Sequence, residues 1–364
     1  MALVALRAFL YATLLLAASV SLCRAGARPA VSFATATISG RHVTYLVVRL
    51  DRVRVETALG HDRVARMESL AQMALRHHAL AAIDGGFFES SFRGPIKDLI
   101  DTTVVNGRLV FKGDSGSTLF FDAKNRASIA QIPLRIEGAL DGSYAYPNNW
   151  FAYWINRYPE NASRSTVTIF TPAWGSATGL RGFQVLVEDG VIVQIAHRSL
   201  PIPLDGYVIY VRGEPEMASH FRVGRRIAYR LVRRDGEGLG SFGDAWQAIG
   251  GGPRLLLDGR VALDPHAEGF HDPALFRIAE RSIVGVTRDG RRLILATATG
   301  TLHQMARIMR RLGAYDAMNL DGGASSGLWA WGHYLTRPHR MLNNALLILP
   351  RKPYVGNVAS RHIP

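Results

Sequence analysis

The sequence predicts an α+β fold in which antiparallel sheet dominates and a few helices pack against it. Apolar or alternating runs meet repeatedly at two-residue turns, clear helical periodicity is confined to two stretches, and no low-complexity linker interrupts the chain. Asn-Gly and Asp-Gly pairs between such runs are strong hairpin signals, because type I′ turns need positive φ at both central residues. We therefore expect a single domain over residues 28–364.

Four hairpins follow from these turn signals. Three have apolar runs on both sides of one pair, namely 104–111 around Asn106-Gly107, 186–193 around Asp189-Gly190 and 255–263 around Asp258-Gly259. The fourth joins 283–286 to 293–296 across Asp289-Gly290, where a type I′ turn is again expected. Antiparallel pairs should therefore recur along the chain.

Two helices are predicted. The better one covers 302–312, with Leu302, Met305 and Met309 on one face, a capping box from Thr301 to Gln304, and Gly313 at the C′ position. The other is expected over 63–77, with Asp62 as its N-cap.

Each predicted helix is followed by a short apolar strand and then by an Asp-Gly-Gly turn, at Asp84 after the first helix and at Asp321 after the second. This repeated helix-strand-turn unit predicts two related half-units within one domain. Both carboxylates should emerge where a buried strand ends, beside glycines that let backbone approach a ligand closely.

The first 27 residues are typical of a secretory signal peptide. A short basic region ends at Arg7, an apolar run follows over 8–20, and small residues at Ala25 and Ala27 suit cleavage. Cleavage there would remove Cys23, the only cysteine, whereas an uncleaved anchor or lipidation at Cys23 stays open as an alternative. We expect export to the periplasm or the medium and no membrane span after cleavage.

The charge balance favours an anionic partner. The chain has 43 basic and 29 acidic residues, a formal charge of +14, which falls to +12 when Arg7 and Arg24 leave with the signal. Nucleic acid is not expected, because the arginines are scattered and no recognised nucleic-acid motif is present. A phosphorylated or acidic glycan, or an anionic envelope, suits an exported protein better.

The two Asp-Gly-Gly turns are the candidate chemical sites. Asp84 precedes Gly85-Gly86 and two phenylalanines, and Asp321 precedes a run that offers unhindered N–H groups and two hydroxyls, Gly322, Gly323, Ser325 and Ser326. Such a run can cradle an oxyanion. A third glycine run, 250–252, is followed by Arg254. The alternative is that each turn is structural and its Asp bonds nearby backbone N–H groups.

Several motifs in one order resemble the phosphodiester glycosidase family. They are Ala-Ile-Asp-Gly-Gly-Phe-Phe from Ala82, Gly-Gly-Gly-Pro-Arg-Leu-Leu from Gly250, Arg-Ser-Ile-Val-Gly-Val from Arg281, Asn-Leu-Asp-Gly-Gly-Ala-Ser-Ser from Asn319, and Asn-Asn-Ala-Leu-Leu-Ile from Asn343. The resemblance covers about 80–350. Two departures stand out: the family usually has Asn where this chain has Asp84, and 296–300 lacks an expected Asp-Gly-Arg, which points to a different substrate.

The resemblance implies a hydrolase that cleaves the bond between a sugar anomeric carbon and a phosphate. Glycosidases normally use two carboxylates around an oxocarbenium-like transition state. We therefore expect Asp321 to act as nucleophile or general base and Asp84 to assist it or bind a sugar hydroxyl. Arg281 and Arg340 should hold the phosphate through forked hydrogen bonds, and Ser325 with the glycine amides should complete the cradle.

Two other classes remain possible on the sequence. One is a noncatalytic envelope protein that binds an anionic glycan, and the other is a phosphodiesterase in which Asp84 and Asp321 hold Ca²⁺ or Mg²⁺. No cofactor is expected, and the histidines form no zinc motif. The sequence leaves the sugar, the aglycone and the oligomeric state open.

Overall fold

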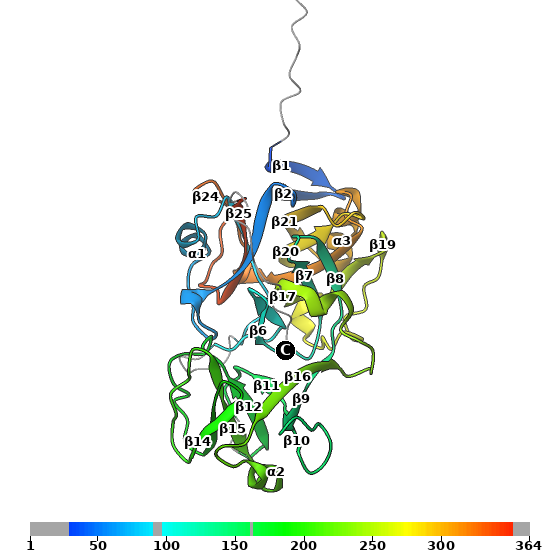
Figure 1. Ribbon diagram of the computed structural model, residues 1–364. Coiled ribbons are helices and arrows are strands. Elements are labelled where there is room, and N and C mark those ends of the chain that lie inside the picture. Colours follow the sequence, from blue (N-terminus) through cyan, green and yellow to red (C-terminus); the bar gives the residue numbers. More distant parts are fainter. Residues whose placement is uncertain (1–28, 90–96, 161–162, 352–364) are drawn as a thin grey trace, which may run out of the picture.

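The computed structural model describes residues 29–89, 97–160 and 163–351. The predicted signal peptide, 1–27, lies outside the described residues. Figure 1 shows two lobes: the larger contains both chain ends of the described part, and the smaller contains β9 to β16. No helix in these described ranges is long and apolar enough to cross a membrane.

Three sheets build the larger lobe. The seven-stranded sheet has the order β1 (Val31–Ile38), β2 (Arg41–Arg49), β21 (Arg292–Gly300), β20 (Ala279–Val286), β22 (Asp316–Gly322), β18 (Arg254–Leu257) and β19 (Arg260–Val261). The second has β24 (His333–Thr336), β23 (Leu328–Ala330), β4 (Ala81–Asp84), β25 (Asn344–Pro350) and β3 (Val53–Leu59). The third has β6 (Arg108–Phe111), β5 (Thr103–Val105), β17 (Ala245–Gly251), β7 (Ser117–Asp122) and β8 (Ala127–Ala130).

Two sheets build the smaller lobe. One has β10 (Asn149–Ala152), β9 (Leu134–Leu140) and β16 (Ile227–Arg233), and the other has β11 (Trp154–Ile155), β12 (Thr166–Phe170), β15 (Gly206–Arg212), β13 (Phe183–Glu188) and β14 (Val191–Ala196). Among the described strands every pairing is antiparallel except that of β11 with β12. The predicted class, mostly antiparallel sheet with few helices, is confirmed.

The helices are short. They are α1 (Leu70–Arg76), α2 (Pro215–His220) and α3 (Leu302–Arg311), with 3₁₀ turns at η1 (Gly60–Asp62), η2 (Gly240–Asp244), η3 (Pro273–Phe276) and η4 (Gly323–Ser325). The capping box from Thr301 to Gln304 is present, so the prediction for α3 is confirmed. The prediction for α1 began too early, because Ser69 and Gln72 form the capping box. Asp62 instead has positive φ and pairs with Arg76.

All four predicted hairpins form, as β5–β6, β13–β14, β18–β19 and β20–β21. In the first three, both turn residues have positive φ, as a type I′ turn requires. The fourth differs, because only Gly290 has positive φ. The amide of Thr287 donates to the carbonyl of Arg292 and that of Gly290 to Thr287, so this turn is longer than predicted.

Apolar side chains of the three large sheets meet in one core cluster that includes Leu46, Ile83, Leu119, Val284 and Leu346. Helix α1 packs on the outer face of the sheet that contains β4, the next strand in the chain. Helix α3 packs in the same way on the sheet that contains β22. The helix-strand-turn unit thus occurs twice, while a common origin of the two units stays a prediction. Both Asp-Gly-Gly turns therefore begin on a central, buried strand.

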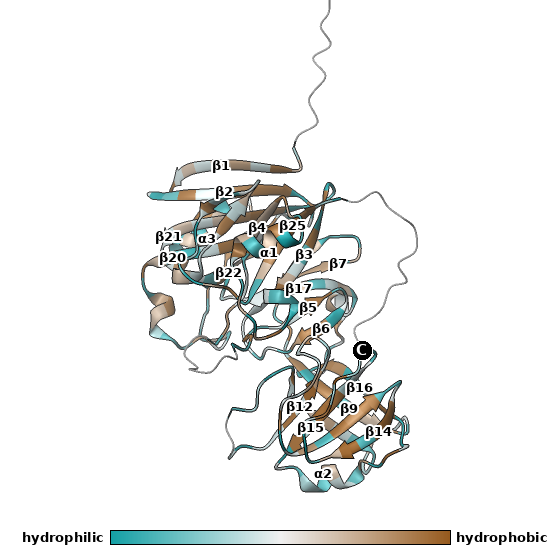
Figure 2. Cartoon of the chain, turned by 90° about the vertical axis from the view of Figure 1, so that its left-hand side faces the viewer, coloured by the Kyte–Doolittle hydropathy of each residue, from teal (hydrophilic) through white to brown (hydrophobic). Residues whose placement is uncertain are grey.

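The two lobes share apolar packing. One cluster joins Val104, Phe120 and Ala248 of the larger lobe to side chains of the smaller lobe such as Ile136 and Ile169. Figure 2 shows strands coloured as hydrophobic in both lobes, among them β9, β12 and β15 of the smaller lobe. The single-domain boundary at 28–364 stays a prediction, and this shared cluster is what supports it.

Candidate active site

The two Asp-Gly-Gly turns, which are more than 200 residues apart in the chain, meet in one place. The amide of Asp321 donates to the carbonyl of Gly85 at 2.9 Å, and that of Asp84 donates to the carbonyl of Gly327 at 3.2 Å. The amide of Gly327 in turn donates to Asp84 Oδ1 at 2.8 Å. The two turns are thus fastened to each other by backbone, which fixes the separation of their carboxylates.

Glycine is required after Asp84 because other groups lie against the backbone. A Cβ at Gly85 would lie 1.8 Å from Asn344 Oδ1, and one at Gly86 would lie 2.3 Å from the carbonyl oxygen of Gly250. The amide of Gly86 donates to Asn344 Oδ1 at 2.7 Å, and Asn344 Nδ2 donates back to the carbonyl of Gly86 at 3.1 Å. The N–H of Gly86 is therefore bound to Asn344 and is not available to a ligand, so Gly86 is part of the wall of the site.

Asp84 is a buried acid whose surroundings favour the protonated form. Its carboxyl is fully buried, Oδ1 accepts from the Ser282 hydroxyl and the Gly327 amide, and Oδ2 has no partner among the described residues. Burial raises the pKa of Asp84 well above its ordinary value, and the nearby charge of Asp321 raises it further. A protonated carboxyl offers one acceptor and one donor, which is also what an asparagine amide offers.

That equivalence gives a physical reason for a departure noted in the sequence. Asp84 stands where the resembling family usually has Asn, and a buried, protonated Asp can take over the role of a neutral hydrogen-bonding side chain. Asp84 is therefore better suited to bind or position a group than to carry negative charge.

Asp321 is the carboxylate with a charged partner. Its Oδ2 accepts from Arg340 Nη2 at 2.8 Å, and its Oδ1 accepts from the amide of Gly322 at 2.8 Å. Arg340 Nε donates to the Ser325 hydroxyl at 2.6 Å, and its guanidinium lies 4.5 Å from the centre of the Phe88 ring. Burial raises the pKa of Asp321, and Ser325 and Arg340 oppose that rise.

Arg340 is also the more accessible partner. Its side chain is 31% exposed, against 10% for that of Asp321. A guanidinium has five N–H donors, of which the two bonds to Ser325 and Asp321 use only part. Arg340 can therefore hold Asp321 in place and still receive an anion from solvent.

Arg281 reaches the same turn from β20, where it pairs with Gly322. It is 4% exposed, and its Nη2 donates to the carbonyls of Leu275 and Arg277 at 2.8 Å each. Its Nε is buried without a partner among the described residues. Burial lowers the pKa of Arg281, whereas Asp321 raises it. Arg281 thus anchors the segment around η3 and places a second cation near Asp321.

The run after Asp321 forms η4. The amide of Gly322 donates to the Asp321 carboxylate. Gly323 has positive φ, and no atom lies close to the position that a Cβ would take. Ser325 and Ser326 are both buried. Ser325 contacts Arg340, while Ser326 Oγ has no partner within the described part of the chain. The predicted residues of this turn are therefore brought together with Arg281 and Arg340.

Arg254 is not brought to this cluster. Its Nη2 donates to the carbonyl of Ile129 in β8 at 3.1 Å, and its electrostatic partner is Asp316, at the opposite end of β22 from Asp321. The neighbouring Gly252 has positive φ and a Cβ there would lie 2.9 Å from the Phe270 ring. This segment supports the site through its backbone, and the Arg254 side chain points elsewhere.

Asp101 belongs to the cluster, although nothing in the sequence around it drew attention to it. It is 1% exposed, its Oδ2 accepts from the amide of Phe87 at 2.6 Å, and its Oδ1 has no partner in the described ranges. Burial raises the pKa of Asp101 to about 8, opposed by the Phe87 amide and reinforced by the charge of Asp321. Only the fold, which places β5 beside β17 and the Asp84 turn, identifies it.

The three acids therefore divide into two types. The pKa values of Asp84 and Asp101 are raised by burial, that of Asp101 to about 8, whereas Asp321 is the acid held by a guanidinium. Asp321 lies beside two arginines, Arg340 and Arg281, which suits an anionic substrate. Among the described residues, no group of three or more His, Cys, Asp or Glu side chains is arranged to hold a metal ion.

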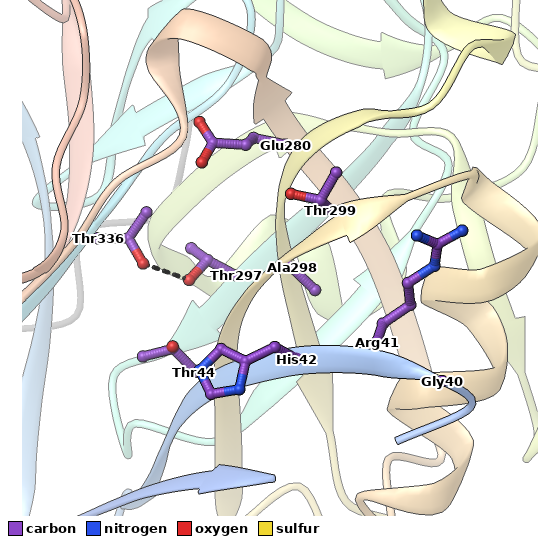
Figure 3. Close-up of a pocket in the computed structure, with 9 residues that line it drawn as sticks. All are labelled: Gly40, Arg41, His42, Thr44, Glu280, Thr297, Ala298, Thr299 and Thr336. Atoms are coloured by element: carbon purple, nitrogen blue, oxygen red, sulfur yellow. Dashed lines mark hydrogen bonds between the residues drawn. The ribbon is translucent and has the colours of Figure 1, made fainter. Parts of the chain in front are cut away.

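A polar cavity of about 280 Å³ lies beside this cluster (Figure 3). It is lined by residues of β2, β20, β21 and β24 and by the turn before β2, including His42, Thr44, Glu280, Thr297 and Thr299. Thr297 and Thr336 lie side by side in its wall, where their hydroxyls are hydrogen-bonded at 2.6 Å. Three of its residues, Thr297 to Thr299, come from the segment where the expected Asp-Gly-Arg is missing.

The fold and the site together define a mostly antiparallel protein with buried acids and arginines at paired glycine turns. Residues 181–349 match the model of the phosphodiester glycosidase family. The resemblance predicted from the motifs is confirmed over that range, which includes Arg281, Asp321 and Arg340, while Asp84 and Asp101 precede it.

Solved structures share the fold. A hypothetical protein from Synechocystis is 21% identical with a TM-score of 0.75, and the match covers 88% of this chain and 62% of that one. A protein from Burkholderia pseudomallei, provisionally described as exported, is 22% identical with a TM-score of 0.66 over 85% and 74%. This chain thus spans 62% of the length of the Synechocystis protein.

The zebrafish N-acetylglucosamine-1-phosphodiester alpha-N-acetylglucosaminidase catalytic domain, auto-inhibited by its pro-peptide, also matches. It is 14% identical with a TM-score of 0.44, over 88% of this chain and 82% of that domain. A comparison with curated proteins finds no match to this sequence.

Proposed function

We propose that this protein is an exported hydrolase that cleaves the bond between a sugar anomeric carbon and a phosphate in a sugar-1-phosphodiester. The substrate would be part of an envelope polymer, an exopolysaccharide or a phosphorylated glycan. The observation that carries the proposal is the pair formed by Asp321 and Arg340, set beside two buried acids with raised pKa values and a second arginine.

Asp321 is the group proposed to attack or to activate water. A carboxylate whose pKa is raised by burial is more basic than one in solution, and basicity closer to working pH favours general base catalysis. The positive charge of Arg340 lowers the pKa of Asp321. A phosphate bound to the guanidinium of Arg340 would partly neutralise that charge. Binding would then make Asp321 more basic at the moment when it is needed.

Arg340 and Arg281 are proposed to receive the phosphate. A phosphate leaving group is already stable as an anion, so holding it matters more than protonating it. Guanidinium groups suit this task because they bind phosphate oxygens through two parallel N–H donors. Arg340 is the outer group of the two, since its side chain is partly exposed and that of Arg281 is buried.

Asp84 is proposed to assist Asp321 as a neutral acid that fixes the two turns together. Its proton belongs on Oδ2, because Oδ1 accepts from Ser282 and Gly327. Because Oδ2 is enclosed by protein, the protonated acid would support the site without adding negative charge beside the phosphate. Two ionised acids next to Asp321 would repel the substrate, so their protonation is part of the proposed function.

Export is proposed from the basic start, the apolar run over 8–20 and the small residues at Ala25 and Ala27. The Burkholderia pseudomallei protein of the same fold is described as exported. We propose the periplasm or the medium as the location of the mature protein, with a phosphorylated glycan as its partner and without a cofactor.

The experiment is hydrolysis in ¹⁸O-labelled water. The purified protein is incubated with N-acetylhexosamine-1-phosphodiesters, and free reducing sugar and phosphomonoester are measured together. Attack at the anomeric carbon breaks the bond from that carbon to oxygen and places ¹⁸O in the sugar. Attack at phosphorus places ¹⁸O in the phosphomonoester.

The outcomes separate the three classes. Label in the sugar supports the glycosidase, and label in the phosphate together with loss of turnover on chelation supports a metal-assisted phosphodiesterase. Binding of the substrates with no turnover across the panel supports a noncatalytic glycan-binding protein.

A further inference from the structure

The cavity drawn in Figure 3 is polar on nearly every side. Its walls include the hydroxyls of Thr44, Thr297, Thr299 and Thr336, the carboxylate of Glu280, the guanidinium of Arg41 and the imidazole of His42. No large apolar side chain is among the described residues that line it. A cavity of about 280 Å³ is large enough for one small polar ring and too small for a chain of them.

The register of the sheet connects this cavity to the acid cluster. Ser282 of β20 pairs with Thr297 of β21, which pairs with Thr44 of β2. Side chains directly opposite each other lie on the same face, so these three form one row across the sheet. Ser282 is the residue whose hydroxyl donates to Asp84. The row therefore runs from the cavity to the Asp84 carboxyl.

A second row lies one step along the strands. Glu280 pairs with Thr299 across β20 and β21. The carbonyl oxygen of Glu280 lies 3.0 Å from where a Cβ of Gly322 would be, and the carboxylate of Glu280 lies 3.9 Å from His339 Nε2. His339 directly precedes Arg340 in the chain. Glu280 thus borders the cavity on one side and the Asp321 turn on the other.

We propose that this cavity binds the sugar ring of the substrate. Threonine hydroxyls can donate to and accept from sugar hydroxyls, and a carboxylate accepts from two neighbouring hydroxyls at once. Glu280 and Arg41 bring opposite charges to the cavity, whereas Arg340 and Arg281 both lie at Asp321, so the phosphate belongs at Arg340 and the uncharged ring belongs in the cavity. The assignment rests on the proposed function for the position of the phosphate, whereas ring binding can be tested without turnover.

The first test is saturation-transfer difference NMR with free glucose and free N-acetylglucosamine as probes. The variant Thr299→Trp fills the cavity from an exposed strand position, so the sheet need not rearrange. The matched control is Val193→Trp, which adds the same side chain at an exposed position of β14 in the smaller lobe. Transfer to ring protons is expected in the wild type and the control and should be lost in Thr299→Trp.

A second variant, Glu280→Gln, tests the chemistry without filling the space. Loss of charged hydrogen bonds should weaken binding of the same sugar about tenfold or more. With a sugar-1-phosphodiester that is turned over, both variants should raise KM far more than they lower kcat, because neither residue contacts the proposed reacting bond.

Transfer that is equal in Thr299→Trp and the control overturns the inference, and so does the absence of transfer to either sugar in the wild type. Transfer that Thr299→Trp abolishes supports it even if no phosphodiester is turned over, in which case the proposed function fails and the ring site stands.

Discussion

Replacing Asp101 with asparagine should flatten the dependence of stability on pH. In the native protein the pKa of Asp101 is about 8, because the carboxyl is buried and lies near Asp321. In the unfolded chain its pKa is close to 3.9. Between these values the native state binds the proton and the unfolded state does not. The contribution of Asp101 to stability is therefore complete below about pH 4 and is lost as pH rises to about 8.

The size of the effect follows from the same values. One pKa unit corresponds to about 1.4 kcal/mol, so the full window corresponds to about 6 kcal/mol, and the interval from pH 5 to pH 8 to about 4 kcal/mol. In Asp101→Asn the new amide oxygen would accept from the Phe87 amide as the carboxyl does, and the side chain cannot ionise. The variant should match the wild type near pH 5 and exceed it by a few kcal/mol near pH 8.

The assay is urea unfolding at several pH values between 5 and 8.5, for the wild type, Asp101→Asn and the exposed-site control Asp205→Asn. The free energy of unfolding of the wild type should fall with pH more steeply than that of Asp101→Asn, and the control should follow the wild type. Parallel profiles for the wild type and Asp101→Asn would refute the claim that Asp101 is held protonated.

Three further predictions concern the same cluster. Asp84→Asn should retain turnover and keep the free energy of unfolding within about 1 kcal/mol of the wild type. Asp84→Ala should lose about 3 kcal/mol by urea unfolding, because the buried Ser282 hydroxyl and the Gly327 amide lose their acceptor. Equal losses in both variants would show that the charge of Asp84 matters. Gly86→Ala should lose at least 2 kcal/mol, because its Cβ would meet the carbonyl of Gly250, while Gly238→Ala, which has open space around it, should be nearly neutral in the same measurement. Arg340→Lys should lower kcat/KM for a sugar-1-phosphodiester by about a hundredfold. The guanidinium of Arg340 binds Ser325 and Asp321 and is proposed to bind the phosphate as well, and one ammonium group cannot make all three contacts. Unchanged kinetics would contradict the placement of Arg340 in the site.

Local patterns predicted the elements best where a single turn or cap determines the structure. Asn106-Gly107 and Thr301 with Gln304 are such cases, since their backbone conformations follow from the residues themselves. Asp62 failed as an N-cap because Ser69 and Gln72 supply a complete capping box seven residues later, and Arg76 binds Asp62 instead. The Asp289-Gly290 hairpin has a longer turn than predicted. The amide of Thr287 donates to the carbonyl of Arg292, its carbonyl accepts from the amide of Gly290, and its hydroxyl donates to Asp289.

The candidate site was predictable in part because its motifs are contiguous. Asp84 and Asp321 are each followed directly by two glycines, so the sequence alone identifies both turns. Arg281 and Arg340 were predicted from the resemblance to the family. Asp101 could not be found this way, since its role arises from burial against a turn 14 residues away and from the charge of Asp321. Arg254 was misleading because adjacency to a glycine run does not determine where a long side chain points.

The most direct test of the proposed mechanism is the kcat of Asp321→Asn on the best substrate found, with folding checked by its urea midpoint. Asparagine keeps the shape of the side chain and removes its charge and basicity. A fall of about a thousandfold or more is expected if this carboxylate attacks or activates water. A folded Asp321→Asn enzyme with wild-type kcat would contradict the assignment of the chemistry to Asp321.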